Sequence, residues 1–153
     1  MDISRFVPQF KQPRPGLITG GQPEAAAWAA LADAGVTTVV NLRPDFEMPE
    51  RNEALEVASA GLTYVNVPIA GADTLKPSQA AALWQALEAS PGTVLVHCGT
   101  GNRCGALLAL VEAWHRGGSP REALEFGRRA GLSGLEPVVR GILGMSARAY
   151  AGS

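Results

Sequence analysis

A cysteine, an arginine and two glycines lie close together in the segment HCGTGNRC, residues 97–104. The apolar run VLV ends one residue before His97-Cys98, and Arg103 stands where a helical pattern begins. A thiol beside an arginine at a helix N-terminus has a lowered pKa and becomes a good nucleophile. These residue types at this spacing therefore predict a reactive cysteine next to an anion-binding loop.

The residues between Cys98 and Arg103 are suited to hold an anion. Glycines allow a positive φ and a close approach of the backbone to a ligand. The first helical turn adds N–H groups without an internal partner, and an arginine can add a bidentate fork. We call residues 98–103 the anion cradle. The residues expected to bind the anion are Gly99, Thr100, Gly101, Asn102 and Arg103. The alternative is a tight strand-to-helix turn that buries a small thiol.

Strands and helices that alternate along the chain would position this loop. The segment GLITGGQP (16–23) predicts a short strand and a turn, and apolar, β-branched runs predict strands at 36–43, 62–69 and 93–97. Helical patterns with proline at the start or glycine at the end predict helices at 23–35, 49–61, 77–89, 104–116, 120–130 and 135–149. This alternation predicts an α/β fold whose mostly parallel sheet of four to five strands is flanked by helices. Ligands bind at the carboxyl ends of such strands, where Cys98 is expected.

Length and composition indicate one folded domain. The chain has 153 residues, of which 46% are hydrophobic and 18% charged, which excludes a disordered or collagen-like protein. Residues 1–15 contain three prolines and are expected to form an extended arm before a domain at 16–150. The apolar runs are too short for a membrane span, and the first residues do not match a secretory signal. We therefore expect a cytoplasmic protein that does not bind membranes.

Charge and cysteine content limit the kinds of ligand and cofactor that the chain is expected to bind. Residues 91–153 carry seven arginines and four glutamates, so a mild positive field surrounds the expected loop and favours an anionic ligand. There is no Lys/Arg run interleaved with aromatic residues, so nucleic acid is not expected. Two cysteines and two histidines are too few for a disulfide framework or a convincing zinc site. We expect no metal and no organic cofactor.

The loop resembles the active-site loop of the cysteine-dependent protein tyrosine and dual-specificity phosphatases. The upstream segment ITGGQPEAAAWAALADAGVTTVVNLRPDFE is similar to the first part of that fold. More specifically, the chain resembles the bacterial group called the beta-lactamase hydrolase-like phosphatase domain, over roughly residues 16–145. The matching positions are His97, Cys98, Gly101, Arg103 and Cys104 in the loop, and Asn41, Leu42, Arg43, Pro44 and Glu47 upstream.

The resemblance implies a single-domain cysteine-phosphatase-like fold and a reaction. Cys98 would attack a phosphate monoester and form a phosphocysteine intermediate, with Arg103 holding the phosphate oxygens. Such enzymes need a general acid for the leaving oxygen, and the resemblance points to Asp73. The alternative for Asp73 is an ordinary turn former in a polar loop.

Two departures from the phosphatase pattern keep other functions open. Only four residues separate Cys98 from Arg103, where the usual signature has five, and rhodanese-type sulfurtransferases have a similarly short loop. The first alternative is therefore a sulfurtransferase that carries a persulfide on Cys98. Cys104 replaces the usual Ser or Thr, and it either resolves an oxidised Cys98 or simply fills the first helical turn. The second alternative is a redox-sensing or anion-binding module of low activity. The partner is thus a phosphorylated substrate, or another small oxyanion or sulfane donor, and the sequence gives no oligomeric state.

Two more residues are expected to support the loop. The His97 side chain should point away from the cradle if residue 97 is still in the strand, and we expect it to hydrogen-bond the loop. It is not expected to be a base or a metal ligand. Arg43 follows a strand at the same sheet edge as Cys98, and it either binds a substrate anion or pairs with Glu47. The pair is the preferred interpretation.

Overall fold

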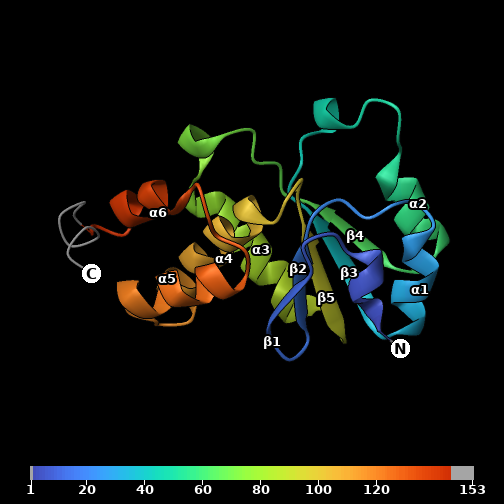
Figure 1. The fold of residues 1–153 in the computed structure, drawn as a ribbon, viewed down its shortest axis with the longest axis horizontal. Coiled ribbons are helices and arrows are strands. Elements are labelled where there is room, and N and C mark those ends of the chain that lie inside the picture. Colours follow the sequence, from blue (N-terminus) through green and yellow to red (C-terminus); the bar gives the residue numbers. More distant parts are fainter. Residues whose placement is uncertain (1, 146–153) are drawn as a thin grey trace.

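The computed structural model of the protein describes residues 2–145 and contains one five-stranded sheet (Figure 1). The strand order is β1-β2-β5-β3-β4, in which β1 runs antiparallel to β2 and the other neighbours are parallel. The strands are β1 (Lys11–Arg14), β2 (Leu17–Gly20), β3 (Val36–Asn41), β4 (Thr63–Asn66) and β5 (Thr93–His97). The expected α/β class with a mostly parallel sheet is confirmed.

Helices cover both faces of this sheet. Helices α1 (Ala27–Asp33) and α2 (Glu53–Ser59) lie on one face, and the other four lie on the opposite face (Figure 1). Those four are α3 (Pro77–Ala89), α4 (Asn102–His115), α5 (Pro120–Arg129) and α6 (Glu136–Ile142). Three 3₁₀ turns complete the chain: η1 (Ile3–Phe6), η2 (Asp45–Glu47) and η3 (Ala72–Thr74). No helix among residues 2–145 is long and apolar enough to cross a membrane.

The central strands are buried because both of their faces carry apolar side chains. Val39, Val40, Leu95 and Val96 each have no exposed surface. Alternate residues of β3 and β5 therefore pack into two separate cores, one under α3–α6 and one under η1, α1 and α2. A strand that is buried on both faces reads as a continuous apolar run, which is why the sequence pattern located these strands.

The N-terminal residues are part of the sheet, which corrects the expectation of an extended arm. Val7 is 1% exposed and belongs to the core under α1, and β1 extends the sheet beside β2. Gly20 makes this close approach possible, since a Cβ there would lie 2.3 Å from the Val7 side chain. The prediction of an arm relied on the prolines of this segment. Pro13 is compatible with β1 because an edge strand tolerates proline at a position that makes no hydrogen bond to the neighbouring strand.

Two helix boundaries near the functional loop and the C-terminus also differ from expectation. Helix α4 begins at Asn102, two residues before the expected start, so Arg103 lies in its first turn. Helix α6 ends at Ile142, although a helix was expected to residue 149. Residues 146–149 and the expected domain end at residue 150 lie outside the described residues.

Candidate active site

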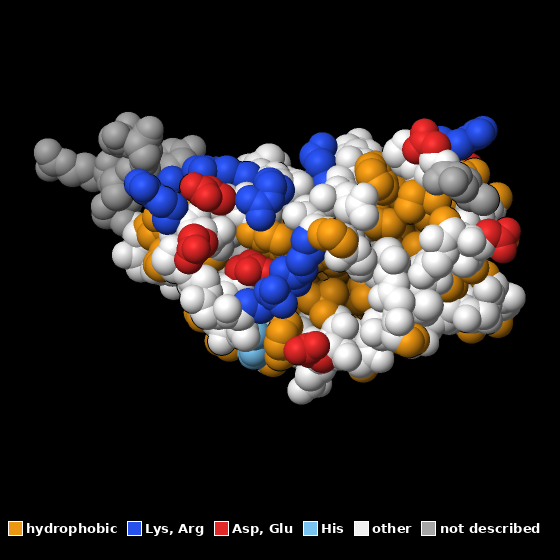
Figure 2. All heavy atoms as spheres, turned by 90° about the horizontal axis from the view of Figure 1, so that it is seen from below, with side chains coloured by type: hydrophobic (Ala, Val, Ile, Leu, Met, Phe, Trp, Pro, Cys, Tyr) orange, Lys and Arg blue, Asp and Glu red, His pale blue; other side chains and the backbone are white. Residues whose placement is uncertain are grey.

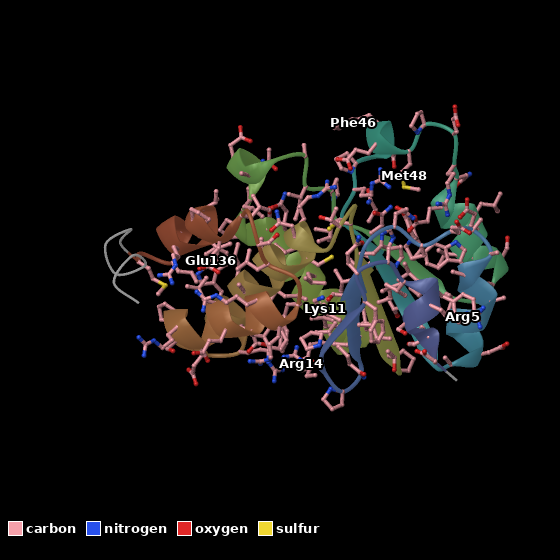
Figure 3. All side chains as sticks on the ribbon, in the orientation of Figure 1. Arg5, Lys11, Arg14, Phe46, Met48 and Glu136 are labelled. Atoms are coloured by element: carbon pink, nitrogen blue, oxygen red, sulfur yellow. The ribbon has the colours of Figure 1, made fainter. Side chains whose placement is uncertain are left out.

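The carboxyl ends of β3, β4 and β5 meet at one edge of the sheet, and Cys98 lies at the end of β5. The segments that follow β3 and β4 rise beyond this edge, and the first of them carries Phe46 and Met48 (Figure 3). Gly101 has φ 98°, a left-handed conformation that only glycine adopts at little cost. This conformation changes the chain direction so that α4 begins at the next residue. Cys98 is 1% exposed beneath this turn.

The sulfur of Cys98 is surrounded by hydrogen-bond donors. The Gly101 N–H donates to Cys98 Sγ at 3.0 Å, and the thiol of Cys104 lies 3.7 Å from it. These contacts lower the pKa of Cys98 to about 5. The Cys104 thiol is the largest cause, the N–H groups of Cys104, Thr100 and Gly101 contribute further, and burial opposes the shift. Cys98 is therefore a thiolate at neutral pH, as expected for a nucleophile.

Cys104 can serve as a donor because it stays protonated. Its side chain has no exposed surface, and burial, followed by the hydrogen bond to Cys98 and the charge of that thiolate, raises its pKa well above the usual value. Its Sγ also lies 3.4 Å from the Val96 carbonyl oxygen. In the phosphatases that the loop resembles, a Ser or Thr hydroxyl occupies this position, so the Cys104 thiol stands in for that hydroxyl.

Arg103 is held by protein acceptors at the end of its guanidinium group, and it also interacts with the Cys98 sulfur. Its Nη1 donates to Glu47 Oε2 and to the Ile69 carbonyl oxygen, both at 2.9 Å, and its Nη2 donates to Glu47 Oε1 at 2.9 Å. A guanidinium group has five N–H bonds in a planar fork. Arg103 also hydrogen-bonds the Cys98 sulfur. Its planar fork of N–H groups therefore lies beside the nucleophile, where it suits two oxygens of a tetrahedral anion.

Glu47 is the residue that holds Arg103, and sequence reasoning missed this role. The expected pair between Arg43 and Glu47 is confirmed, with Arg43 Nε 3.1 Å from Glu47 Oε1. The same carboxylate also accepts both hydrogen bonds from Arg103, and these two arginines lower its pKa, Arg103 more strongly. The NLRPDFE segment contained the signal, because it places the Glu47 carboxylate six residues after β3, at the sheet edge that also holds Cys98.

The four residues inside the loop have different roles. Thr100 pairs with Gly21 in an isolated bridge, which anchors the loop to the chain after β2. Asn102 turns its side chain away from the loop, and its Oδ1 accepts hydrogen bonds from the N–H groups of Ser133 and Leu135 at 2.9 and 3.2 Å. Asn102 could therefore bind an anion only through its backbone N–H, as could Gly99 and Gly101.

His97 points away from the cradle as expected, but its predicted hydrogen bond to the loop is wrong. Its Nε2 donates to Glu53 Oε2 of α2 at 2.6 Å, and both side chains are buried. The opposite ring nitrogen, Nδ1, has no hydrogen-bond partner. Alternation along β5 directs His97 to the face covered by α1 and α2, whereas Cys104 belongs to the opposite core.

Asp73 lies on η3, in the connection between β4 and α3. Its side chain is exposed, and Oδ1 would lie 3.3 Å from a Cβ added at Gly71. The connection is attached to the cradle four residues earlier, where Ile69 accepts the hydrogen bond from Arg103. Asp73 thus lies on a short segment whose start is fixed to the anion-binding arginine.

Several further features of residues 2–145 lie outside the cradle. Among residues 2–145, no group of three or more His, Cys, Asp or Glu side chains could hold a metal ion. A cavity of about 540 Å³ lies beside η2 and α2, and none of the cradle residues lines it.

Basic side chains are spread over the face drawn in Figure 2. The guanidinium groups of Arg14 and Arg129 lie over the Phe126 ring, 4.8 and 5.2 Å from its centroid.

Comparison with known proteins identifies the family. The model of the beta-lactamase hydrolase-like protein, phosphatase-like domain, matches residues 11–115, which is more than half of the chain. The chain belongs to this family. Relatives named beta-lactamase hydrolase-like protein are 37% identical over 100 residues in Xylella fastidiosa and 32% identical over 101 residues in Agrobacterium fabrum. Each match covers 63% of this chain and 23% of the relative, so the chain spans about a quarter of their length.

Solved structures confirm the fold of this beta-lactamase hydrolase-like phosphatase domain. A DUF442 protein from Shewanella putrefaciens has a TM-score of 0.71 and 23% identity, over 92% of this chain and 95% of that one. Tk-PTP in its active form also has a TM-score of 0.71, with 24% identity over 90% and 97%. TpbA from P. aeruginosa, solved in complex with phosphotyrosine, has a TM-score of 0.70 and 21% identity over 97% and 90%. The expected cysteine-phosphatase-like fold is thus confirmed.

Replacing Cys104 should raise the pKa of Cys98. In Cys104→Ala, the pKa should rise from about 5 by about one unit, because a hydrogen bond to a charged group contributes about 1.5–3 kcal/mol. The pH dependence of iodoacetamide alkylation measures this pKa, and alkylation between pH 5 and 6 should slow. Cys104→Ser retains a donor and should keep the midpoint low. An unchanged midpoint in Cys104→Ala would show that Cys104 does not stabilise the thiolate.

Proposed function

We propose that this domain is a cysteine-dependent phosphatase, of the tyrosine or dual-specificity type, that hydrolyses phosphate monoesters through a phosphocysteine intermediate. One observation carries the proposal: the low-pKa sulfur of Cys98 and the guanidinium group of Arg103, which Glu47 holds, interact within the same short loop. A nucleophile and an anion clamp held together in this way favour attack on a tetrahedral oxyanion.

In the first step, Cys98 Sγ attacks phosphorus, and the bond between phosphorus and the ester oxygen breaks. The leaving oxygen takes a proton from Asp73, which becomes a carboxylate. The guanidinium group of Arg103, together with loop N–H groups, holds the phosphoryl oxygens and stabilises their charge in the transition state. No metal ion or organic cofactor is required for this step.

In the second step, water attacks phosphorus while the Asp73 carboxylate removes one of its protons. The bond between sulfur and phosphorus breaks, inorganic phosphate leaves, and Cys98 returns to the thiolate. The Cys104 thiol stabilises this leaving thiolate through the contact at 3.7 Å. Asp73 regains its proton in this step, so the cycle closes without another reactant.

The role of Asp73 rests on the attachment of its segment. The hydrogen bond from Arg103 to Ile69 places the start of the connection next to the cradle, and a chain extends at most about 3.5 Å per residue. Asp73 therefore lies within about 14 Å of Ile69, and the proposal requires its carboxyl group to turn toward a leaving oxygen above Cys98. Its exposed side chain is free to turn toward a bound substrate.

The first test compares two reactions in the wild type and in Cys98→Ser. The wild type should hydrolyse an aryl phosphate, and Cys98→Ser should lose this activity by a factor on the order of 10³ or more, because the nucleophile is removed. The second assay measures sulfur transfer from thiosulfate to cyanide. Sulfur transfer without phosphate hydrolysis would support the sulfurtransferase alternative and refute the proposal. Turnover of phosphotyrosine and phosphoserine peptides would then separate the tyrosine type from the dual-specificity type.

A second prediction concerns the general acid. In Asp73→Asn, kcat for an alkyl phosphate should fall by about 10²–10⁴, because the poor leaving group needs the proton. The loss should be much smaller for a nitrophenyl phosphate, whose leaving group departs without help. Asp45→Asn, on η2 at the same sheet edge, is the matched control and should retain wild-type activity. Equal losses for both substrates in Asp73→Asn would argue against a role in proton transfer.

A second candidate function is redox control of the nucleophile, and the distance of 3.7 Å between the sulfurs of Cys98 and Cys104 favours it. A hydroperoxide would transfer one oxygen to the Cys98 thiolate, giving a sulfenic acid and releasing water or an alcohol. The Cys104 sulfur would then attack the sulfenic sulfur, forming a disulfide and expelling water that carries the Cys104 proton. Two electrons thus pass from the two cysteines to the peroxide.

Mass spectrometry after mild treatment with hydrogen peroxide tests this step. The wild type should lose two hydrogens in a cross-link between Cys98 and Cys104, and a thiol reductant should restore it. In Cys104→Ser, Cys98 should instead proceed to the sulfinic acid. Overoxidation of Cys98 in the wild type, without a cross-link, would refute redox control and leave the phosphatase proposal untouched.

A further inference from the structure

A chain of side-chain hydrogen bonds runs around the cradle, from the residue before Cys98 to the residue that ends the loop. His97 Nε2 lies 2.6 Å from Glu53, and Glu53 Oε1 accepts from Gln22 Nε2 at 2.8 Å. Gln22 Oε1 in turn accepts from Arg43 Nη1 at 2.9 Å. Through Glu47, Arg43 is then linked to Arg103. These six residues come from five separate segments, so only the folded chain brings them together.

We infer that Gln22 is a positioning residue of the reaction: its amide joins the buried carboxylate behind the nucleophile to the arginine pair that orients Arg103. The inference rests on the proposed function, and it adds a residue that touches neither the sulfur nor the anion. Gln22 lies in the turn between β2 and α1, outside the loop and outside the NLRPDFE segment.

The chemistry of the two neighbours explains why a glutamine is needed. The Glu53 carboxylate only accepts hydrogen bonds, and the Arg43 guanidinium only donates them. A bridge between them must donate on one side and accept on the other, and a primary amide does both. A carboxylate at this position would repel Glu53, a cation would repel Arg43, and an apolar side chain would satisfy neither.

Burial makes the bridge rigid on the Glu53 side. Glu53 is 4% exposed and His97 has no exposed surface, so this carboxylate depends on protein donors. His97 donates to one of its oxygens and Gln22 to the other. Loss of the Gln22 donor would leave a buried carboxylate oxygen without its partner, which is costly and would drive local rearrangement.

The other side of the bridge controls Arg103 through a shared atom. Glu47 Oε1 accepts from Arg43 Nε and from Arg103 Nη2, so a displacement of Arg43 shifts the carboxylate that holds Arg103. Gln22 restrains Arg43 by accepting from its Nη1. Because a misplacement of about 1 Å costs on the order of 10²-fold in rate, a loosened Arg43 should weaken the anion clamp measurably.

Gln22→Met removes both hydrogen bonds at similar volume and tests the inference. We expect kcat/KM for an aryl phosphate to fall about 5- to 30-fold. Tungstate, a tetrahedral oxyanion, should protect Cys98 from iodoacetamide less well by a similar factor. The alkylation midpoint near pH 5 should move by less than about half a pH unit, because the Cys104 thiol and the loop N–H groups that lower the pKa of Cys98 are unchanged. Gln85→Met, the same change at an exposed position on α3, is the matched control and should behave like the wild type.

A double-mutant cycle with Glu47→Gln separates positioning from general loosening of the fold. If Gln22 acts through Glu47, then Gln22→Met should cause less than about a twofold further loss of tungstate protection when Glu47→Gln is already present. If the losses of tungstate protection in the two single variants multiply in the double variant, Gln22 and Glu47 act independently and the inference is overturned.

Gln22→Glu provides a second readout that a packing role would not produce. Its protonated carboxyl group can donate to Glu53 and accept from Arg43, as the amide does. The activity of this variant relative to the wild type should therefore rise as the pH falls from 8 to about 5.5, within the range over which carboxyl groups near another negative charge titrate. A constant ratio over this range would contradict the proposed bridge.

Failure of the inference can be distinguished from failure of the proposed function. The protection assay needs only the thiolate and an oxyanion, so it is informative even if the wild type does not hydrolyse aryl phosphates. An active wild type whose Gln22→Met variant matches it in turnover and in tungstate protection would refute the role of Gln22 alone. An inactive wild type would refute the phosphatase proposal.

Discussion

The negative charge on the buried sulfur of Cys98 constrains all of its surroundings. A charge that is 1% exposed must be compensated by nearby donors or it will be neutralised by a proton. Backbone N–H groups of the loop and the thiol of Cys104 supply this compensation. The left-handed turn at Gly101 directs an N–H group at the sulfur, and the early start of α4 places Arg103 beside it. The same features that stabilise the thiolate also form the site for an oxyanion.

Electrostatic balance extends outward from the cradle in layers of alternating sign. The thiolate lies near Arg103, Arg103 is held by Glu47, and Glu47 is held by Arg43. Each charge is thus paired with its neighbour, which limits the cost of burying several ionised groups at one sheet edge. Glu47 and Ile69 hold the terminal nitrogens of Arg103, and the same guanidinium group interacts with the Cys98 sulfur. The fold therefore prepares the clamp before any anion arrives.

The strands, the loop and the pair between Arg43 and Glu47 could be predicted because their signals are local. Continuous apolar runs marked β3 and β5, and glycine spacing marked the loop. The partners of His97 and Arg103 could not be predicted, because they lie 44 and 56 residues away in the sequence. The N-terminal strand was missed for a related reason. Its place beside β2 depends on the contact between Val7 and Gly20, which no local pattern reveals.

The side chain of Asn102 has a consequence for the size of the working unit. Its amide oxygen binds the backbone at Ser133 and Leu135, and a Cβ at Gly131 would lie 2.8 Å from the Gly101 carbonyl oxygen. The connection between α5 and α6 therefore packs against the loop and supports it. The match to the family model ends at residue 115, before this connection begins. A chain cut to the residues that match the family would therefore lack the contacts that support the loop.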